Sequence, residues 1–469
     1  MKVIEAVKRV LNGGYRFRLD GRPEDRLVEL ELPARAVIPL GQTPGREARP
    51  VVKVGDEVRA GQVVGRGDRG VSPVHASIGG RVEAVTRLGE TSALAIAGDG
   101  TAGWQPLGGH SRRWDQLPGE ELETLLHASG VTALDGGVPT RFGTASLSSC
   151  EVENLIIEGV EDGPYPVSVL ALLAGERREH FVEGIGILQK LMPRARLHLA
   201  VSSERPGLAR ELTAKLGSRG PVSLHALAPK YPQGHRTLLT RTILGNDARG
   251  RAAAAKTTIL SVATVLHARD AVVEGKPLME RTVALCGPGW KENLHLQVRV
   301  GTPVEFIAQK YLKPGRNRLV VNCPLTSGSL ADLSVPVDRT FSSLIAVPEH
   351  QDAELLSVKR LLTGKFECNT GLHGEGRPCV FCGYCEDACP VGIIPHLLDK
   401  RVKRNLIGQD LVTYGIFECV ECNLCTFVCP SKIPVARHIK LGQRKLMEHR
   451  PKKLPDKNAA VQHRGGETA

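Results

Sequence analysis

The chain has 469 residues, which is too long for one compact core and predicts several domains. Hydrophobic residues make up 41% of the sequence and charged residues 24%, as in an ordinary globular protein, and no apolar run approaches the roughly 18 residues of a membrane-spanning helix. The formal net charge is +12, but aromatic residues are only 4%, which argues against a nucleic-acid partner because single-strand binders combine basic grooves with aromatic stacking platforms.

The first residues, MKVIEAVKRVLNGG, lack the apolar core of an export signal. Their spacing predicts a short amphipathic helix with Ile4, Val7 and Leu11 on one face. We treat residues 1–28 as an N-terminal segment and expect a cytoplasmic protein. In that compartment the twelve cysteines stay reduced, which favours metal ligation over disulfides.

Residues 29–105 combine short runs of valine and isoleucine with glycine turns, a pattern typical of a small β barrel or sandwich. The stretches VKVGDEVRAGQVVG and SPVHASIGGRV resemble the lipoyl/biotinyl hammerhead. In carrier domains of that type a lysine at a hairpin tip is acylated, whereas the tip here is Asp68-Arg69-Gly70. We therefore predict a docking module and not a swinging-arm carrier.

Residues 115–272 alternate strand and helix patterns. LIIEGV and ARLHLAVS predict buried strands, while PVSVLALLAGERREHFVEGIGILQKLM and PGLARELTAKLG predict helices, so we expect a sheet of βαβ type. Over residues 273–352 the strand patterns TVALCG, LHLQVRVG, LVVNC and FSSLIAVP predict a small β-rich domain. The expected fold class is multidomain, with α/β and α+β parts.

Residues 353–445 contain two cysteine runs that repeat at an interval of forty residues. CVFCGYCEDACP begins at Cys379 and CVECNLCTFVCP begins at Cys419, and both have the pattern C-x2-C-x2-C-x3-C-P of bacterial cluster-binding proteins. Three thiolates three residues apart can reach three irons of one cubane, while the fourth binds the other cluster. The predicted ligands of one [4Fe–4S] cluster are Cys379, Cys382, Cys385 and Cys429, and those of the other are Cys419, Cys422, Cys425 and Cys389.

Zinc is the alternative metal for these cysteines. A C-x2-C pair is common in zinc sites, but zinc sites use separated pairs and not four consecutive thiolates followed by proline. The interval between the runs, with its segment IIPHLLDKRVKRNL, predicts a helical ferredoxin-type insert. The other cysteines lack this grouping and are expected to be small apolar residues; they are Cys150, Cys286, Cys323 and Cys368.

The C-terminal segment is basic, and we treat residues 446–469 as a tail. Between Arg437 and Lys457 there are eight Lys or Arg residues against Glu448 and Asp456. Such a segment can face anionic lipid headgroups or an acidic redox partner. The alternative is a solvated tail. The sequence therefore leaves open a peripheral association with the cytoplasmic face of the inner membrane.

The order of these domains resembles the RnfC family, the C component of the Rnf ion-translocating electron-transport complex. The resemblance covers about residues 30–440 and is carried by IPLGQTPGREARPVVKVGDEVRAGQVVG, PVHASIGGRV, KYPQG, EGKPLMERTVALCG, LQVRVGTP, PVDRT and the two cysteine runs. It implies an α/β domain like the flavin subunit of respiratory complex I, which binds FMN and takes a hydride from NADH. It also implies a β-grasp domain of the soluble-ligand-binding type and a helical dicluster ferredoxin domain that passes electrons to membrane subunits.

The flavin motifs of that family are altered in this chain. The family loop G-x-G-G-x-G-F-P-T corresponds to ALDGGVPT, residues 133–140, which is one residue shorter. Gly136 and Gly137 remain, but Asp135 places a negative charge where the loop would approach a phosphate.

The family motif N-G-x-E-x-E-P-Y corresponds to EGVEDGPY, in which Glu158 replaces the asparagine and Gly163 the second glutamate. After KYPQG, Arg236 stands near the position of a family glutamate. The resemblance implies these FMN-binding residues: Gly136, Gly137, Glu161 and Tyr165. Three altered motifs in one region predict that the flavin and NADH site is lost or remodelled while the cluster ligands are kept.

Three functions are compatible with the sequence. The first is an iron–sulfur subunit that relays electrons through two clusters to a partner oxidoreductase or membrane complex. The second is an FMN-dependent subunit that oxidises NADH, or one that resembles the cobalamin reductases with this domain plan. The third is a non-redox module with structural clusters, against which the intact second cysteine run argues. We expect the first, as an oxidoreductase subunit, and leave NADH dehydrogenase activity open.

Overall fold

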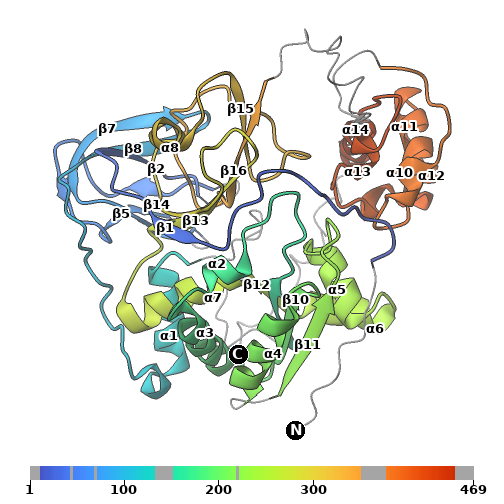
Figure 1. Cartoon of the computed structure of the whole chain (residues 1–469). Helices are drawn as coiled ribbons and strands as arrows, with labels where there is room; N and C mark the ends of the chain where they lie inside the picture. The colour runs from blue at the N-terminus through green and yellow to red at the C-terminus, as the bar shows by residue number, and fades with distance from the viewer. Residues whose placement is uncertain are drawn as a thin grey trace, which may run out of the picture. The chain divides into compact units, whose positions relative to one another are not determined.

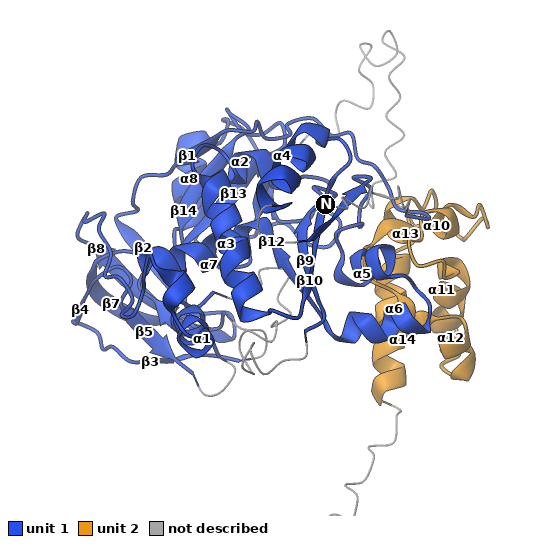
Figure 2. Ribbon diagram, turned by 90° about the horizontal axis from the view of Figure 1, so that it is seen from below, with its two compact units in different colours: residues 1–366 blue, residues 367–469 orange. Residues whose placement is uncertain are grey.

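The structure is a computed structural model of the chain, and it describes residues 11–42, 46–67, 71–131, 152–217, 221–349 and 376–448. The chain divides into two compact units, residues 1–366 and residues 367–469 (Figure 2). Among the residues that the structure describes, unit 1 has four β-sheets with their helices, and unit 2 is helical (Figure 1). Within the described ranges, no helix has both the length and the apolar character needed to cross a membrane.

The N-terminal β part contains two antiparallel sheets. One has the order β2 (Arg35–Pro39), β8 (Thr91–Gly98), β7 (Gly80–Leu88), β4 (Glu57–Val58), and the other has β3 (Arg49–Pro50), β5 (Val63–Arg66), β6 (Val74–His75). Inward side chains such as Ile38 and Val64 form a shared apolar core, which confirms the expected sandwich. Gly80 has a φ of +146°, and a Cβ there would collide with the backbone oxygen of Ala97. The hairpin tip at residues 68–70 lies outside the described residues.

The α/β part is built on a four-stranded parallel sheet. Its order is β11 (Val222–Leu227), β10 (Arg196–Ser202), β9 (Asn154–Gly159), β12 (Thr257–Ser261). Alternate side chains of β9 enter different cores: Leu155 and Ile157 join one, and Ile156 joins the other. Both faces are therefore apolar, as expected for a sheet covered by helices on each side.

Helices supply the covering layers of this sheet. Side chains of α1, α3, α4 and α7 share the core of Leu155, while α5 contributes to the core of Ile156. The bounds are α1 (Gly119–Ala128), α2 (Val169–Leu172), α3 (Arg177–Leu191), α4 (Pro206–Gly217), α5 (Arg236–Leu244), α6 (Ala248–Ala255) and α7 (Val262–Arg269), with short helical turns at Trp114–Gln116 and Asp270–Glu274. The single helix predicted across α2 and α3 is wrong: Gly175 has a φ of +59°, and the chain breaks there into two helices.

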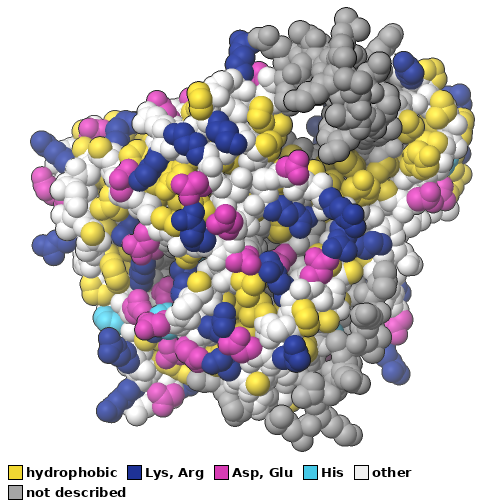
Figure 3. All heavy atoms as spheres, viewed as in Figure 1, with side chains coloured by type: hydrophobic (Ala, Val, Ile, Leu, Met, Phe, Trp, Pro, Cys, Tyr) yellow, Lys and Arg dark blue, Asp and Glu magenta, His cyan; other side chains and the backbone are white. Residues whose placement is uncertain are grey.

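A five-stranded mixed sheet completes unit 1. Its order is β1 (Leu27–Glu29), β14 (His295–Arg299), β13 (Glu280–Cys286), β16 (Ser343–Pro348), β15 (Asn317–Val321). Helix α8 (Val304–Tyr311) packs its Val304 and Ile307 into the core of this sheet. Strand β1 pairs in parallel with β14, so the end of the N-terminal segment (residues 1–28) is part of this sheet. On the face drawn in Figure 3, acidic and basic side chains are interspersed.

Unit 2 is built from the two cysteine runs and a helical core. Its helices are α10 (Tyr384–Asp387), α11 (Pro395–Lys403), α12 (Gln409–Thr413), α13 (Leu424–Phe427) and α14 (Val435–Glu448), with a short turn at Ile416–Glu418. Leu398 and Val402 of α11 pack in one core with Ile439 of α14. Helix α11 lies in the interval that was predicted to be helical. Residues 449–469 lie outside the described residues.

Candidate functional site

The first predicted cluster site is a cavity in unit 2. Cys379, Cys382, Cys385 and Cys429 all line it. Three of these residues belong to the first cysteine run and Cys429 to the second, so the fold brings together residues fifty positions apart. Cys385 lies on α10, and Cys429 follows α13. A four-thiol donor set fits the preference of iron–sulfur clusters for cysteine ligands.

The thiols of the second predicted set also lie near one another. The charges of Cys419, Cys422 and Cys425 each interact with that of Cys389, which comes from the first run. Burial raises the pKa of Cys422 to about 12 and raises the pKa of Cys425 and Cys419 as well. Such thiols keep their protons without a metal, and ligation replaces those protons with iron.

The first cavity opens toward solvent. Cys382 is exposed, and so are large apolar neighbours: Val380 is 66% exposed, Phe381 57% and Tyr384 56%. The Phe381 ring packs edge-on against His396, with centroids 5.7 Å apart. The second set, by contrast, is half-buried or buried; its members are Cys389, Cys419, Cys422 and Cys425. The first set therefore contains the most exposed thiol of the eight predicted ligands, that of Cys382.

A buried carboxylate supports the first cavity. Asp399 of α11 lines it, and its side chain is only 3% exposed. His438 Nδ1 of α14 lies 2.6 Å from Asp399 Oδ1, and Lys403 Nζ lies 3.2 Å from Oδ2. Asp399 thereby joins α11 to α14 beside the predicted cluster.

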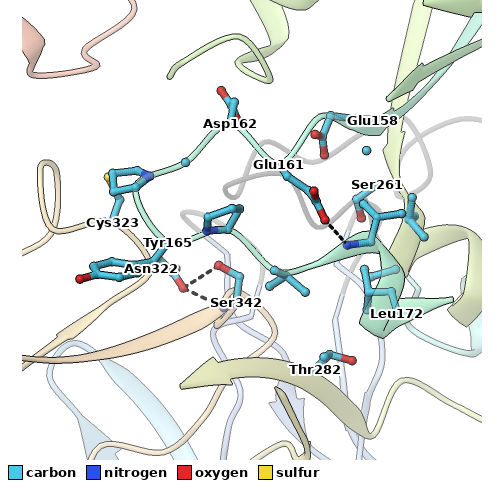
Figure 4. Close-up of a pocket in the computed structure, with 18 of the residues that line it drawn as sticks. Glu158, Glu161, Asp162, Tyr165, Leu172, Ser261, Thr282, Asn322, Cys323 and Ser342 are labelled. Carbon is cyan, nitrogen blue, oxygen red and sulfur yellow. Dashed lines mark hydrogen bonds between the residues drawn. The ribbon is translucent and has the colours of Figure 1, made fainter. Parts of the chain in front are cut away.

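Unit 1 contains a second candidate site, a cavity of about 310 Å³ (Figure 4). Glu158 and Gly159 at the carboxyl end of β9 and Ser261 at the carboxyl end of β12 line it. The chain runs from β9 outward to β10 and β11 and then returns to β12 on the other side of β9. The cavity therefore lies where the strand order reverses, which is the usual ligand position in open α/β sheets.

Two of the predicted flavin residues line this cavity, but both are engaged within the chain. Glu161 accepts a hydrogen bond of 2.7 Å from the Val169 backbone and forms an ion pair of 3.2 Å with Arg205. The Tyr165 hydroxyl donates to the backbone oxygen of Asp20 at 2.9 Å, and burial raises the pKa of Tyr165 to about 12. Gly136 and Gly137, the other two, lie outside the described residues.

The wall beside Glu161 is acidic. Glu158 Oε1 accepts a bond of 2.9 Å from the Val160 backbone, and Asp162 Oδ2 accepts one of 2.7 Å from Gly234. Burial raises the pKa of Asp162 to about 6. The carboxylates in the altered motif therefore line the cavity, as Figure 4 shows for Glu158, Glu161 and Asp162.

The opposite wall comes from the five-stranded sheet. Asn322 and Cys323, which follow β15, lie across the cavity from Ser261 (Figure 4). Asn322 Oδ1 accepts a hydrogen bond of 2.8 Å from the backbone of Ser342, which fixes this wall. Arg281 of β13 lines the cavity as well. Sequence reasoning missed these residues because they come from a separate sheet and no local spacing links them to the α/β motifs.

Comparisons with known proteins agree with the cysteine and β-sandwich patterns. The family model described as RnfC Barrel sandwich hybrid domain matches residues 22–96, and that described as 4Fe-4S dicluster domain matches residues 378–433. The chain is 30% identical over 436 residues to the C component of the ion-translocating oxidoreductase complex of Pseudomonas aeruginosa, covering 90% of this chain and 54% of the relative. It is 27% identical over 444 residues to the protein of the same name from Rhodobacter capsulatus, covering 92% and 81%.

The chain thus spans about half the length of the Pseudomonas relative. Among solved structures, one chain of an NAD+-reducing [NiFe]-hydrogenase in the air-oxidized state is similar; the alignment covers 71% of this chain and 65% of the hydrogenase chain. Its TM-score is 0.46 at 14% identity.

Proposed function

Because the chain belongs to the RnfC family, we propose that it is an iron–sulfur electron-transfer subunit that relays electrons through two [4Fe–4S] clusters to a partner oxidoreductase or membrane complex. The observation that carries this proposal is the cavity in unit 2 lined by four cysteines from both runs. Bound clusters would supply reversible one-electron exchange. We propose Cys379, Cys382, Cys385 and Cys429 as the ligands of one cluster, and Cys419, Cys422, Cys425 and Cys389 as the ligands of the other.

The exposed residues around the first cavity support the proposal that the partner protein contacts unit 2 at this cavity. Val380, Phe381 and Tyr384 are exposed beside Cys382, so a partner can approach this cluster without a rearrangement of unit 2. The second set is more deeply buried and would exchange electrons within the unit. In this proposal the cluster next to Phe381 faces the partner.

We propose that the three parts of unit 1 correspond to the three domains that the family resemblance implies besides the ferredoxin domain. We assign the β sandwich as hammerhead-like, the parallel sheet with its helices as similar to the flavin subunit of complex I, and the five-stranded sheet with α8 as β-grasp-like. The hammerhead-like part would then serve in docking.

A second candidate function is FMN-dependent oxidation of NADH. The observation that favours it is the cavity at the reversal of strand order, where α/β proteins bind their ligands. Glu161 and Tyr165 line that cavity, but their polar atoms bind other parts of this chain. A bound FMN would supply the conversion of a hydride into single electrons, and these residues would only shape its cavity.

An anaerobic absorption spectrum separates the two functions. The purified full chain is assayed for iron and flavin, and NADH is then added. The relay predicts about eight irons per chain, no flavin and no response to NADH, with reduction by a low-potential chemical donor. Stoichiometric FMN with bleaching by NADH would instead establish the second function. Clusters that no donor reduces would contradict both.

The basic end of α14 is the proposed docking surface for an acidic partner or an anionic membrane surface. Arg444 is exposed there, and Lys445 Nζ donates to Asn405 at 2.7 Å. Replacing both Arg444 and Lys445 with glutamate is expected to slow electron transfer to the partner about tenfold at low salt, with a smaller effect at high salt, because steering by charge is screened. Stopped-flow kinetics measures this rate.

The matched control reverses two exposed charges in unit 1, Arg249→Glu with Arg251→Glu on α6. It changes the net charge by the same amount and should leave the rate nearly unchanged. Equal slowing by both double variants would mean that net charge and not α14 sets the rate. No slowing by either would remove α14 from the docking surface.

A further inference from the structure

The first turn of α11 faces one of the predicted cluster ligands. His396 is the second residue of this helix, and its ring atom Nδ1 lies 3.9 Å from Cys385 Sγ in the first cavity. Burial raises the pKa of Cys385 to about 11, and a hydrogen bond from the backbone N–H of His396 to the sulfur lowers it. When Nδ1 carries the ring proton, two donors of one residue therefore converge on one sulfur.

The ring of His396 is held by its neighbours. Phe381, which also lines the cavity, packs edge-on against it with ring centroids 5.7 Å apart. Lys400 lies one turn further along α11, and its Nζ atom is 3.5 Å from the centroid of the Phe381 ring. A cation therefore lies against an aromatic ring of the first cavity.

The second cysteine run allows a comparison within the chain, because it repeats the first at an interval of forty residues. Ala436 has on α14 the position that His396 has on α11, eleven residues after the third cysteine of its run. Its methyl side chain has no donor, and its backbone N–H donates to Thr426 Oγ1 at 3.0 Å. Within the described residues 376–448, Cys425 therefore lacks both of the donors that His396 offers to Cys385.

The charges of the two halves differ in the same sense. Forty residues after Phe381 and Lys400 stand Glu421 and Lys440, which form an ion pair of 2.6 Å. Burial raises the pKa of Cys419, and the charge of Glu421 adds to this rise while its backbone N–H lowers the pKa. The first half thus has a lysine against a neutral ring where the second half has a lysine paired with a carboxylate.

A one-electron reduction makes a cluster more negative, so N–H donors to its sulfur ligands and nearby cations favour the reduced form. We propose that His396 is a positioning residue that acts through Cys385 to raise the reduction potential of the first cluster above that of the cluster bound by Cys425. An electron that enters unit 2 then resides mainly on the cluster beside the exposed side chain of Phe381. This inference rests on the relay function proposed above and adds to it the order of the two potentials.

The test is an anaerobic redox titration of the full cluster-containing chain with a low-potential chemical donor, followed by electron paramagnetic resonance at one fixed pH. The unaltered chain should show two one-electron steps. The step at higher potential should be the one that is missing when Cys379 and Cys429 are both replaced with alanine. His396→Ala should shift the equilibrium of that step about tenfold toward the oxidised form, which is ~59 mV for one electron, and leave the other step in place.

Matched variants separate an effect on the potential from a structural role. His396→Asn keeps an N–H donor and should recover part of the shift, whereas His396→Leu, which only fills the space, should behave like the alanine variant. Glu421→Gln should raise the step at lower potential, because it removes a carboxylate beside Cys419. The control is His127→Ala, which removes an exposed histidine of α1 in unit 1 and should move neither step.

Two steps of equal potential, or loss of the lower step in the Cys379/Cys429 variant, would overturn the inference. His396 variants that leave both steps in place, or that move both equally, would overturn it as well. All of these outcomes leave the relay function standing. A chain without iron, or with clusters that no donor reduces, would overturn the relay function and this inference together. Should the His396 variants not retain the first cluster, the order of the two steps in the unaltered chain decides.

Discussion

Replacing Cys379 and Cys429 together with alanine is expected to leave one [4Fe–4S] cluster in the protein, about four irons per chain. Replacing Cys379 and Cys389 together is expected to remove both clusters. The reason is that Cys379 and Cys429 line one cavity, whereas Cys389 interacts with the thiols of the second run. Anaerobic iron analysis and electron paramagnetic resonance of the reduced protein count the remaining clusters.

The two possible ligand assignments predict opposite cluster counts for these two double variants. If each cysteine run held its own cluster, the Cys379/Cys389 variant would keep one cluster and the Cys379/Cys429 variant would lose both. Cys323→Ala is the control, because Cys323 is a half-buried cysteine of unit 1 outside both runs, and it should keep about eight irons. A zinc content in place of iron after anaerobic preparation would contradict the cluster assignment itself.

Replacing Asp399 with alanine is expected to lower the stability of unit 2 by about 2–3 kcal/mol. The reason is that it removes a buried acceptor that contacts the Lys403 ammonium group and the His438 ring nitrogen. For a unit of this size that loss corresponds to a fall in Tm of roughly 10 °C or more. Thermal unfolding followed anaerobically by circular dichroism and by cluster absorbance measures both effects. Loss of the cluster near Asp399 should accompany unfolding, because this side chain lines its cavity.

Asp410→Ala is the matched control within the same unit. Asp410 pairs with Arg401, but its side chain is 46% exposed, so its loss should cost about 1 kcal/mol or less. Asp399→Asn keeps an acceptor for His438 and should fall between the two alanine variants. Equal changes in Tm for Asp399→Ala and Asp410→Ala would show that burial of Asp399 contributes nothing.

The sequence by itself determined the features that depend on local spacing. The cysteine runs predict their donor sets because the interval between thiols sets the geometry of a loop around a cubane. Helix α4 coincides with PGLARELTAKLG, and β9 and β10 match LIIEGV and ARLHLAVS to within one residue, because their apolar periodicity is local. Strand β1 could not be predicted in the same way, since its three residues are ordered by pairing with β14.

The tertiary structure alone decided what surrounds the cavity. The motif residue Tyr165 remains in the sequence, yet its hydroxyl binds the backbone of Asp20, which belongs to a distant part of the chain. Arg281 and Arg339 look like ordinary charged residues in the sequence, and only packing of β13 and the loop before β16 buries both charges near one another. The burial and pairing of a charge depend on contacts with segments that are distant in the sequence, so no local pattern specifies them. Ligand spacing and strand periodicity, in contrast, depend only on a few consecutive residues.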